Sequence, residues 1–298
     1  MKAYLVDGTY ELFRHYFALP GHLNAAGEEV AATRGVLRSM LSLLGEGATH
    51  VAVATDHVVE SFRNELWEDY KDSSGIAEDL LSQFELLEDS LRAMGLVVWP
   101  MTEYEADDAL AAGAAMAVAD EQVEQVLICT PDKDLAQCVV GRRIVQVDRR
   151  KRLVTHEGGV VKKFGVPPAS IPDYLALVGD AADGFPGIPG FGAKTAATVL
   201  ARYSHIEDIP LRGNDWDVSV RGAGRLAATL AEQMDRALLF RRLATLDGNA
   251  PVSARVEELE WSGPVAGFGD VCARLDDKGL RERVEELAEG RRREMGGP

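Results

Sequence analysis

The sequence predicts an α/β protein with a mostly parallel central sheet, helices on both faces of that sheet, and a smaller helical subdomain. Two observations predict this fold. Short β-rich runs alternate with helical patterns in the first half of the chain, as in sheets whose parallel strands are joined by helices. Around Val166 the pattern changes to helices and glycine-rich turns. We therefore expect one domain over residues 1–165 and another over residues 166–298.

The individual elements follow from local patterns. Strands are expected where short apolar runs are bounded by turn residues, at residues 3–6, 50–55, 96–100, 125–130 and 143–147. Helices are expected where apolar residues recur at three and four positions, around residues 31–45, 80–94 and 106–119. The cationic run Arg149–Arg152 is expected on a hairpin or loop, and the terminal RRREMGGP in a solvated tail.

Composition narrows the class of protein. The chain of 298 residues can bury a sizeable core, and no apolar run approaches the roughly 20 residues needed to cross a bilayer. The N-terminal MKAYLVDG has too short an apolar stretch for a signal peptide, and the three cysteines lack metal-site spacing. These features predict a cytoplasmic protein with reduced thiols. Because the net charge is −16, any binding to nucleic acid must depend on local basic patches and bound cations.

Acidic residues follow four of the expected strands and recur in a later loop. They are Asp7, Asp56, Glu105, Asp107, Asp108, Asp132, Asp134, Asp180 and Asp183. Ligands of open α/β sheets bind at the carboxyl ends of the strands, so the first four groups are expected to converge there. Taken alone, each group is also explained as a turn or helix-cap residue.

Together, however, these carboxylates would raise one another's pKa, and no matching set of Lys, Arg or His accompanies them. We therefore expect Mg²⁺ or Mn²⁺ among them, because hard cations prefer oxygen ligands. Two such ions, roughly 4 Å apart, would suit phosphodiester hydrolysis.

The stretch GIPGFGAKTA, which begins at Gly187, combines tight turns with the start of a helix near Ala193. Gly190 and Gly192 leave room for a phosphate to approach backbone N–H groups, and Lys194 adds a positive charge. Taken alone, such a motif is also explained as a tight turn that binds no ligand. Its position directly after Asp183 favours a loop that grips a nucleic-acid backbone without reading bases.

Several segments carry a family resemblance at the expected spacing. They are DGTYELFRHYFAL (7–19), SFRNELWEDYK (61–71), EADDALA (105–111), TPDKDLAQCV (130–139), GDAADGFPGIPGFGAKTA (179–196) and RALLFRRLATL (236–246). Over about residues 1–247 the chain resembles the 5′→3′ exonuclease and flap-endonuclease family, especially the N-terminal nuclease domain of bacterial DNA polymerase I and its stand-alone relatives.

The resemblance implies a PIN-like nuclease domain whose nine acidic residues bind two or more Mg²⁺ ions. It also implies a helix-hairpin-helix motif over about residues 185–203 that contacts duplex DNA, with K⁺ as a further ligand. Arg14, Arg63 and Lys71 fall where the family contacts the scissile phosphate or the 5′ end. Tyr70 falls where an aromatic side chain stacks on a terminal base.

The chain departs from the family in the arch segment, about residues 64–92. Ser74 stands at an expected Arg position, and residues 72–91 contain six acidic residues and no Lys or Arg. We expect such a segment to hold a single-stranded flap weakly. Its apolar positions are expected to pack in the core: Leu80, Leu81, Phe84, Leu87 and Leu91. Elsewhere, Pro131 and Gly184 replace the usual Gly and Asn.

The sequence thus predicts a monomeric, metal-dependent, structure-specific 5′ nuclease of DNA replication and repair. Asp108→Ala or Asp132→Ala is expected to abolish cleavage without affecting folding. Two alternatives are a DNA junction-binding module with a vestigial acidic site and a nuclease of RNA or RNA–DNA hybrids. The full set of carboxylates argues against the first, and the GIPGFG loop favours DNA or a hybrid. The balance between exonuclease and flap activity, the metal occupancy and protein partners stay open.

Overall fold

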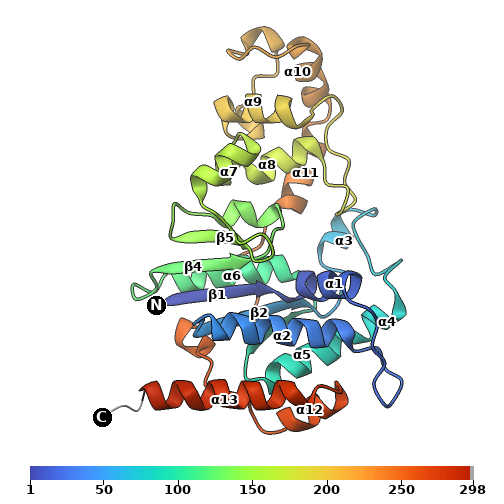
Figure 1. The fold of residues 1–298 in the computed structure, drawn as a ribbon. Coiled ribbons are helices and arrows are strands. Elements are labelled where there is room, and N and C mark those ends of the chain that lie inside the picture. Colours follow the sequence, from blue (N-terminus) through green and yellow to red (C-terminus); the bar gives the residue numbers. More distant parts are fainter. Residues whose placement is uncertain (296–298) are drawn as a thin grey trace. The chain divides into compact units, whose positions relative to one another are not determined.

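A computed structural model describes residues 1–295 of the chain (Figure 1). The chain folds into two compact units. We call residues 1–59, 73–129 and 248–298 the sheet unit, and residues 60–72 and 130–247 the helical unit. Both units are therefore assembled from segments that are distant in the sequence.

The sheet unit has four parallel strands in the order β3-β2-β1-β4. Its elements are β1 (Lys2–Asp7), α1 (Gly8–Ala18), α2 (Ala31–Gly45), β2 (His50–Asp56), α4 (Glu78–Leu81), α5 (Gln83–Ala93), β3 (Val97–Met101), α6 (Ala106–Val118), β4 (Gln125–Cys129), a 3₁₀ turn at Val256–Leu259, α12 (Phe268–Arg274) and α13 (Lys278–Met295). Central β1 pairs Leu5 with Ala52 of β2 and with Ile128 of β4, and all three side chains are fully buried.

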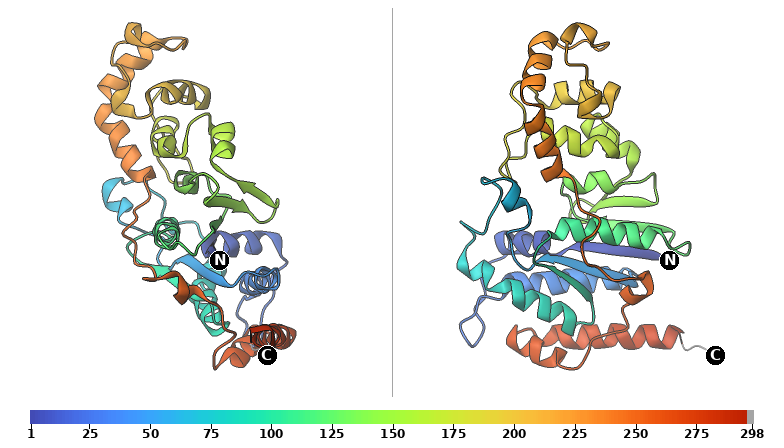
Figure 2. Two further views of the ribbon diagram at one scale, coloured as in Figure 1. Left: turned by 90° about the vertical axis from the view of Figure 1, so that its left-hand side faces the viewer. Right: turned by 180° about the vertical axis from the view of Figure 1, so that it is seen from behind.

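Helices cover both faces of these strands. Helix α6 packs against all four strands, whereas α1 and α5 pack against β2. The left view of Figure 2 shows α6 on one face of the strands and α1 and α2 on the other. The chain steps from β1 to β2 and β3 on one side, and α6 then carries it back to β4 on the other side of β1. Right-handed crossovers place the helices of these two steps on opposite faces, and the arrangement confirms the expected α/β class.

The helical unit contains an antiparallel strand pair and a set of helices. Its elements are α3 (Arg63–Leu66), a 3₁₀ turn at Asp134–Cys138, β5 (Ile144–Asp148), β6 (Leu153–Thr155), α7 (Glu157–Phe164), 3₁₀ turns at Pro168–Ser170, Ile206–Asp208 and Gly213–Asp215, α8 (Ile171–Val178), α9 (Ala193–Tyr203), α10 (Ala223–Glu232) and α11 (Met234–Ala244). Helices α8, α9, α10 and α11 share one apolar core, which includes Leu177, Leu200 and Phe240. The cationic run 149–152 forms the turn between β5 and β6, as expected.

Two expectations about elements need correction. The predicted helix over residues 80–94 is divided into α4 and α5 at Ser82, although Leu80, Phe84 and Leu87 are buried as expected. The expected tail is helical as far as Met295, where α13 ends, and Arg291 is half-buried. Arg292, Arg293 and Glu294 are exposed as expected, while residues 296–298 lie outside the described part. The guanidinium of Arg291 donates to the carbonyls of Leu44 and Ala48 and stacks on the Trp261 ring at 5.0 Å. These contacts give the cationic end of the chain a fixed place on the sheet unit.

Candidate metal centre and nucleic-acid interface

Two carboxylates end neighbouring strands of the sheet unit. Asp7 ends β1, and its Oδ1 accepts a hydrogen bond from the backbone N–H of Tyr10 at 2.8 Å, so that it caps α1. Asp56 ends β2, and its Oδ1 accepts from the backbone N–H of Ala106 at 2.8 Å. Helix α1 starts against β2 because residue 8 is glycine: a Cβ there would lie 2.7 Å from a methyl group of Val53.

Helix α6 brings three more carboxylates to this edge of the strands. Glu105 is its N-cap, and the Oδ2 of Asp108 accepts from the Glu105 N–H at 3.0 Å in a capping box. Asp108 is fully buried, whereas Asp107 is partly exposed. The bond between Asp56 and Ala106 joins the start of α6 to the end of β2. Glu105 and Asp108 therefore do cap α6, as the alternative explanation for acidic residues at a helix start requires. Of the three carboxylates at the start of α6, Asp107 has the most access to solvent.

The helical unit holds a second group, which we call the acidic cluster: Asp134, Asp180 and Asp183. Each is buried, and one carboxylate oxygen from each lies within 4.8 Å of the others. Two backbone hydrogen bonds between Asp180 and Phe185 close the loop that carries two of these carboxylates. Asp132 supports the third, because its Oδ1 accepts from the N–H of Asp134 at 2.9 Å.

The electrostatics of the acidic cluster fit a bound cation. Burial, and then the charges of Asp132 and Asp183, raise the pKa of Asp134 well above its ordinary value. Its Oδ1 is buried and accepts no hydrogen bond within the described residues. An oxygen of this kind is costly to bury unless something positive approaches it. Carboxylate oxygens alone suit a hard divalent cation such as Mg²⁺ or Mn²⁺.

Two lysines lie beside the acidic cluster and compensate part of its negative charge. The Nζ of Lys133 lies 2.5 Å from Oδ2 of Asp180, and the Nζ of Lys71 lies 3.2 Å from Oδ1 of Asp183. Burial lowers the pKa of Lys133, but the charge of Asp134 and the hydrogen bond to Asp180 outweigh burial and raise it. The signal for Lys133 was its place between two aspartates in the sequence DKD.

Two residues expected to touch DNA are buried in the helical unit. Arg63 is 1% exposed, and its guanidinium donates to the carbonyls of Leu243 and Thr245 at 2.8 and 2.9 Å. Tyr70 is 4% exposed and belongs to the apolar core. The phosphate contact of Arg63 and the base stacking of Tyr70 stay predictions, and each would need the buried side chain to become accessible to DNA. Both side chains are used to attach residues 61–71 to the core.

Arg14, the other arginine expected near the substrate, lies in the sheet unit. Its Nη2 donates to Oε2 of buried Glu11 at 2.6 Å, and that oxygen also accepts from Ser39 at 2.9 Å. The Arg14 side chain is 25% exposed. It is held in place and still reaches solvent.

The glycine-rich loop joins two helices, as a helix-hairpin-helix motif requires. It connects α8 to α9, which begins at Ala193 as expected. Gly187 and Gly190 have φ values of +72° and +91°, and a Cβ at Gly187 would lie 2.4 Å from the backbone of residue 179. Gly192 precedes α9, and Lys194 is exposed in its first turn.

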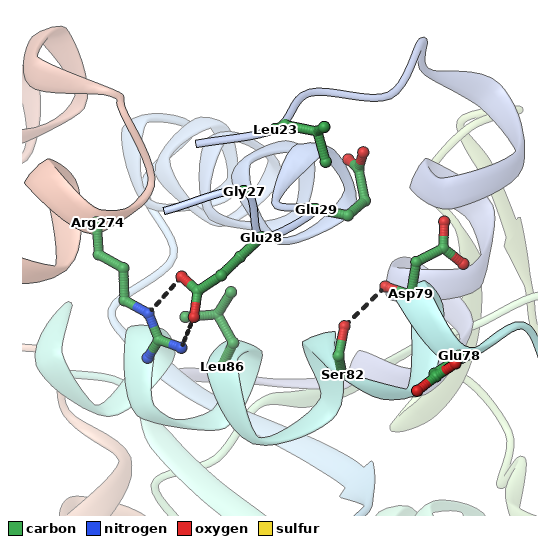
Figure 3. A pocket seen from close by; sticks show the side chains of 9 residues that line it. All are labelled: Leu23, Gly27, Glu28, Glu29, Glu78, Asp79, Ser82, Leu86 and Arg274. Atoms are coloured by element: carbon green, nitrogen blue, oxygen red, sulfur yellow. Dashed lines mark hydrogen bonds and ion pairs between the residues drawn. The ribbon is translucent and has the colours of Figure 1, made fainter. Parts of the chain in front are cut away.

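A cavity of about 550 Å³ lies elsewhere in the sheet unit (Figure 3). Glu28, Glu29, Glu78 and Asp79 line it, and its one cation, Arg274, is paired with Glu28 at 2.9 Å. The surplus of negative charge makes this cavity unsuitable for a phosphate group.

Comparison with known proteins identifies relatives over most of the chain. Residues 2–165 match the 5′-3′ exonuclease N-terminal resolvase-like domain, and residues 166–266 match the 5′-3′ exonuclease C-terminal SAM fold. A 5′-3′ exonuclease of Aquifex aeolicus is 37% identical over 208 residues, covering 69% of this chain and 71% of the relative. DNA polymerase I of Pseudomonas aeruginosa is 35% identical over 265 residues, covering 86% of this chain and 28% of the relative. The chain thus spans less than a third of such a polymerase.

Solved structures share the fold at low sequence identity. The bacteriophage T5 5′-exonuclease with bound zinc has a TM-score of 0.64 at 18% identity, covering 97% of this chain and 99% of that one. The catalytic core of Rad2 in complex with DNA substrate has a TM-score of 0.63 at 15% identity, covering 96% and 91%. Within residues 1–295, no helix combines the length and apolarity required to span a membrane.

Proposed function

Because the chain belongs to the 5′-3′ exonuclease family, we propose that it hydrolyses phosphodiester bonds of DNA at 5′ ends and at single-strand/duplex junctions. The observation that carries this proposal is the acidic cluster, in which three buried carboxylates converge and Asp134 keeps an oxygen without a hydrogen bond. The T5 flap endonuclease structure with DNA and metal ions supports a DNA substrate and a divalent cation.

We propose that Mg²⁺ or Mn²⁺, in two or more sites, is held by the nine acidic residues named from the sequence. When bound, such ions would activate water and stabilise the leaving oxygen of a phosphodiester. The chain's own residues fix the geometry: Asp132 orients Asp134, and the capping box orients Asp108. The Lys71 side chain is paired with Asp183 and is 31% exposed. We assign it the role of stabilising the negative charge of the scissile phosphate. Arg14 stays a predicted phosphate contact.

We propose that the helix-hairpin-helix motif binds the backbone of duplex DNA. Exposed Lys194 and the open surface beside Gly192, where a Cβ would meet no atom within 4 Å, support this role. Gly187 and Gly190 shape the turn. A K⁺ ion at this motif stays a prediction.

The remaining expectations are also proposals. The two family matches meet between residues 165 and 166, which supports a division of the chain there. The free cysteines support a cytoplasmic location. We further propose that the protein is a monomer.

A panel of 5′-labelled flap, nick, gap and blunt DNA duplexes, incubated with Mg²⁺ or Mn²⁺, tests the proposal. We expect cleavage that requires the cation, and product lengths will separate mononucleotide release from cutting at the junction. Asp134→Asn is the matched inactive variant. Binding without cleavage in every metal would favour a junction-binding module, and preferential cleavage of an RNA strand in the same junction would favour the hybrid nuclease.

A further inference from the structure

Residues 61–71 contact the loop that carries Asp183. The N–H of Lys71 donates to the Asp183 carbonyl at 3.2 Å, and its ammonium group lies 3.2 Å from the Asp183 carboxylate. The indole N–H of Trp67 donates to the carbonyl of Gly184 at 3.1 Å. One short segment therefore holds two consecutive residues of the loop by three polar contacts.

The Trp67 side chain is itself held by α11. Its ring packs edge-on against Phe240, with ring centres 5.1 Å apart, and the guanidinium of Arg236 lies 5.4 Å from its centre. The same segment is attached to the end of α11 through Arg63. The indole N–H of Trp67 is thus a donor in a fixed position, and it sets the direction of the Gly184 carbonyl.

Gly184 allows this close approach. Its φ is +84°, and a Cβ at this position would lie 1.9 Å from the carbonyl oxygen of Asp69. Any side chain would push residues 67–71 away from the loop. The close approach at Gly184 and the indole contact to its carbonyl therefore belong to one local arrangement.

On this geometry we infer that Trp67 is a positioning residue for cation binding by the acidic cluster. It acts through the Gly184 carbonyl and holds the neighbouring Asp183 carboxylate close to Asp134 and Asp180. The inference rests on the proposed function, because it concerns the cation that the cluster is proposed to bind. Residues that orient a ligand group affect metal affinity without touching the metal.

The test is Mn²⁺ binding to the full chain, measured by electron paramagnetic resonance in the absence of DNA. Trp67→Phe keeps an aromatic ring against Phe240 but removes the N–H, and we expect about tenfold weaker Mn²⁺ binding. Trp216→Phe is the matched control, because the Trp216 indole N–H also donates to a carbonyl of the helical unit, that of Pro210 at 2.7 Å. We expect the control to bind Mn²⁺ like wild type.

A second variant changes the other partner of the same contact, Gly184. Gly184→Ala is expected to weaken Mn²⁺ binding at least as much as Trp67→Phe, and circular dichroism reports whether each variant folds. Equal Mn²⁺ affinity in Trp67→Phe and wild type would overturn this inference and leave the proposed nuclease intact. Equal weakening in Trp67→Phe and Trp216→Phe would also overturn it. Absence of Mn²⁺ binding by wild type would remove the metal proposal itself.

Discussion

The ammonium nitrogen of Lys133 lies 2.5 Å from a carboxylate oxygen of Asp180 and 3.8 Å from the buried oxygen of Asp134 that accepts no hydrogen bond. One lysine therefore supplies countercharge to two members of the acidic cluster. The side chain of Lys133 is 35% exposed, so solvent screens part of this attraction.

The first prediction concerns this countercharge. Lys133→Met should lower the free energy of unfolding in EDTA by about 1 kcal/mol, because the buried carboxylates lose a cation. Mg²⁺ should restore more stability to the variant than to wild type, since the ion replaces the missing charge. Thermal unfolding in EDTA and in Mg²⁺ measures both effects. An unchanged melting temperature in EDTA would contradict the role of Lys133.

The second prediction concerns Asp134. Asp134→Asn should raise the melting temperature in EDTA, because it removes one of several like charges that are buried together. It should also abolish the rise in melting temperature on addition of Mg²⁺, and DNA cleavage with it. Asp173→Asn is a control elsewhere in the helical unit: Asp173 is buried and pairs with His205 and Arg241, so its neutralisation should destabilise the protein.

The third prediction revises an expectation from the sequence. Asp108→Ala should abolish cleavage and should also lower the stability of the folded protein, because it removes half of a buried capping box. We expect a loss of about 1 kcal/mol in the free energy of unfolding. Urea unfolding measures it. Asp107→Ala, at the partly exposed neighbouring position, should lose activity with a smaller loss of stability.

The fourth prediction concerns pH. A hydrogen bond from Arg274, followed by one from Asn24, lowers the pKa of Glu28 from 4.5 to about 2. Because the pKa is lower in the folded protein, the stabilisation is present above about pH 4.5 and is lost as the pH falls toward 2. The stability difference between wild type and Glu28→Gln should therefore shrink over this range. A constant difference from pH 6 to pH 3 in urea unfolding would contradict the assignment.

The fifth prediction concerns the acidic arch segment. Glu78→Lys combined with Glu85→Lys should increase cleavage of 5′ flaps relative to nicks, because two exposed anions become cations. The gain should disappear at high salt. Glu282→Lys combined with Glu286→Lys, on the exposed side of α13, makes the same change in net charge and is the control. Equal gains in both double variants would point to net charge alone.

Much of the fold could be predicted from periodicity and strand composition. Helix α2 spans residues 31–45 as expected, and each of the five expected strands lies within a residue or two of an observed one. Strand β6 has only three residues and follows a cationic turn, so no run of apolar residues marks it. Residues 291–295 were not predicted as helical, because a run of arginines gives no apolar periodicity. The contacts of Arg291 are made with Leu44 and Trp261, about 250 and 30 residues away, so no local pattern shows them.

The candidate site was predictable in composition but not in its supporting contacts. Carboxylates after strands are visible in a sequence, and so is a lysine between two aspartates. The burial of Arg63 depends on carbonyls of residues 243 and 245, about 180 positions away, and no local pattern shows it. The contact between Trp67 and Gly184 depends in the same way on the backbone of a distant segment.

The place of Arg291 bears on how the protein is made. Its guanidinium binds the carbonyls of Leu44 and Ala48, at the end of a helix that leaves the ribosome long before it. The carbonyls at this helix end therefore lack their Arg291 partner until the whole helical unit has been synthesised. The first strands can pair early in translation, but the contacts that Arg291 makes with their unit form only after residue 291 has been synthesised.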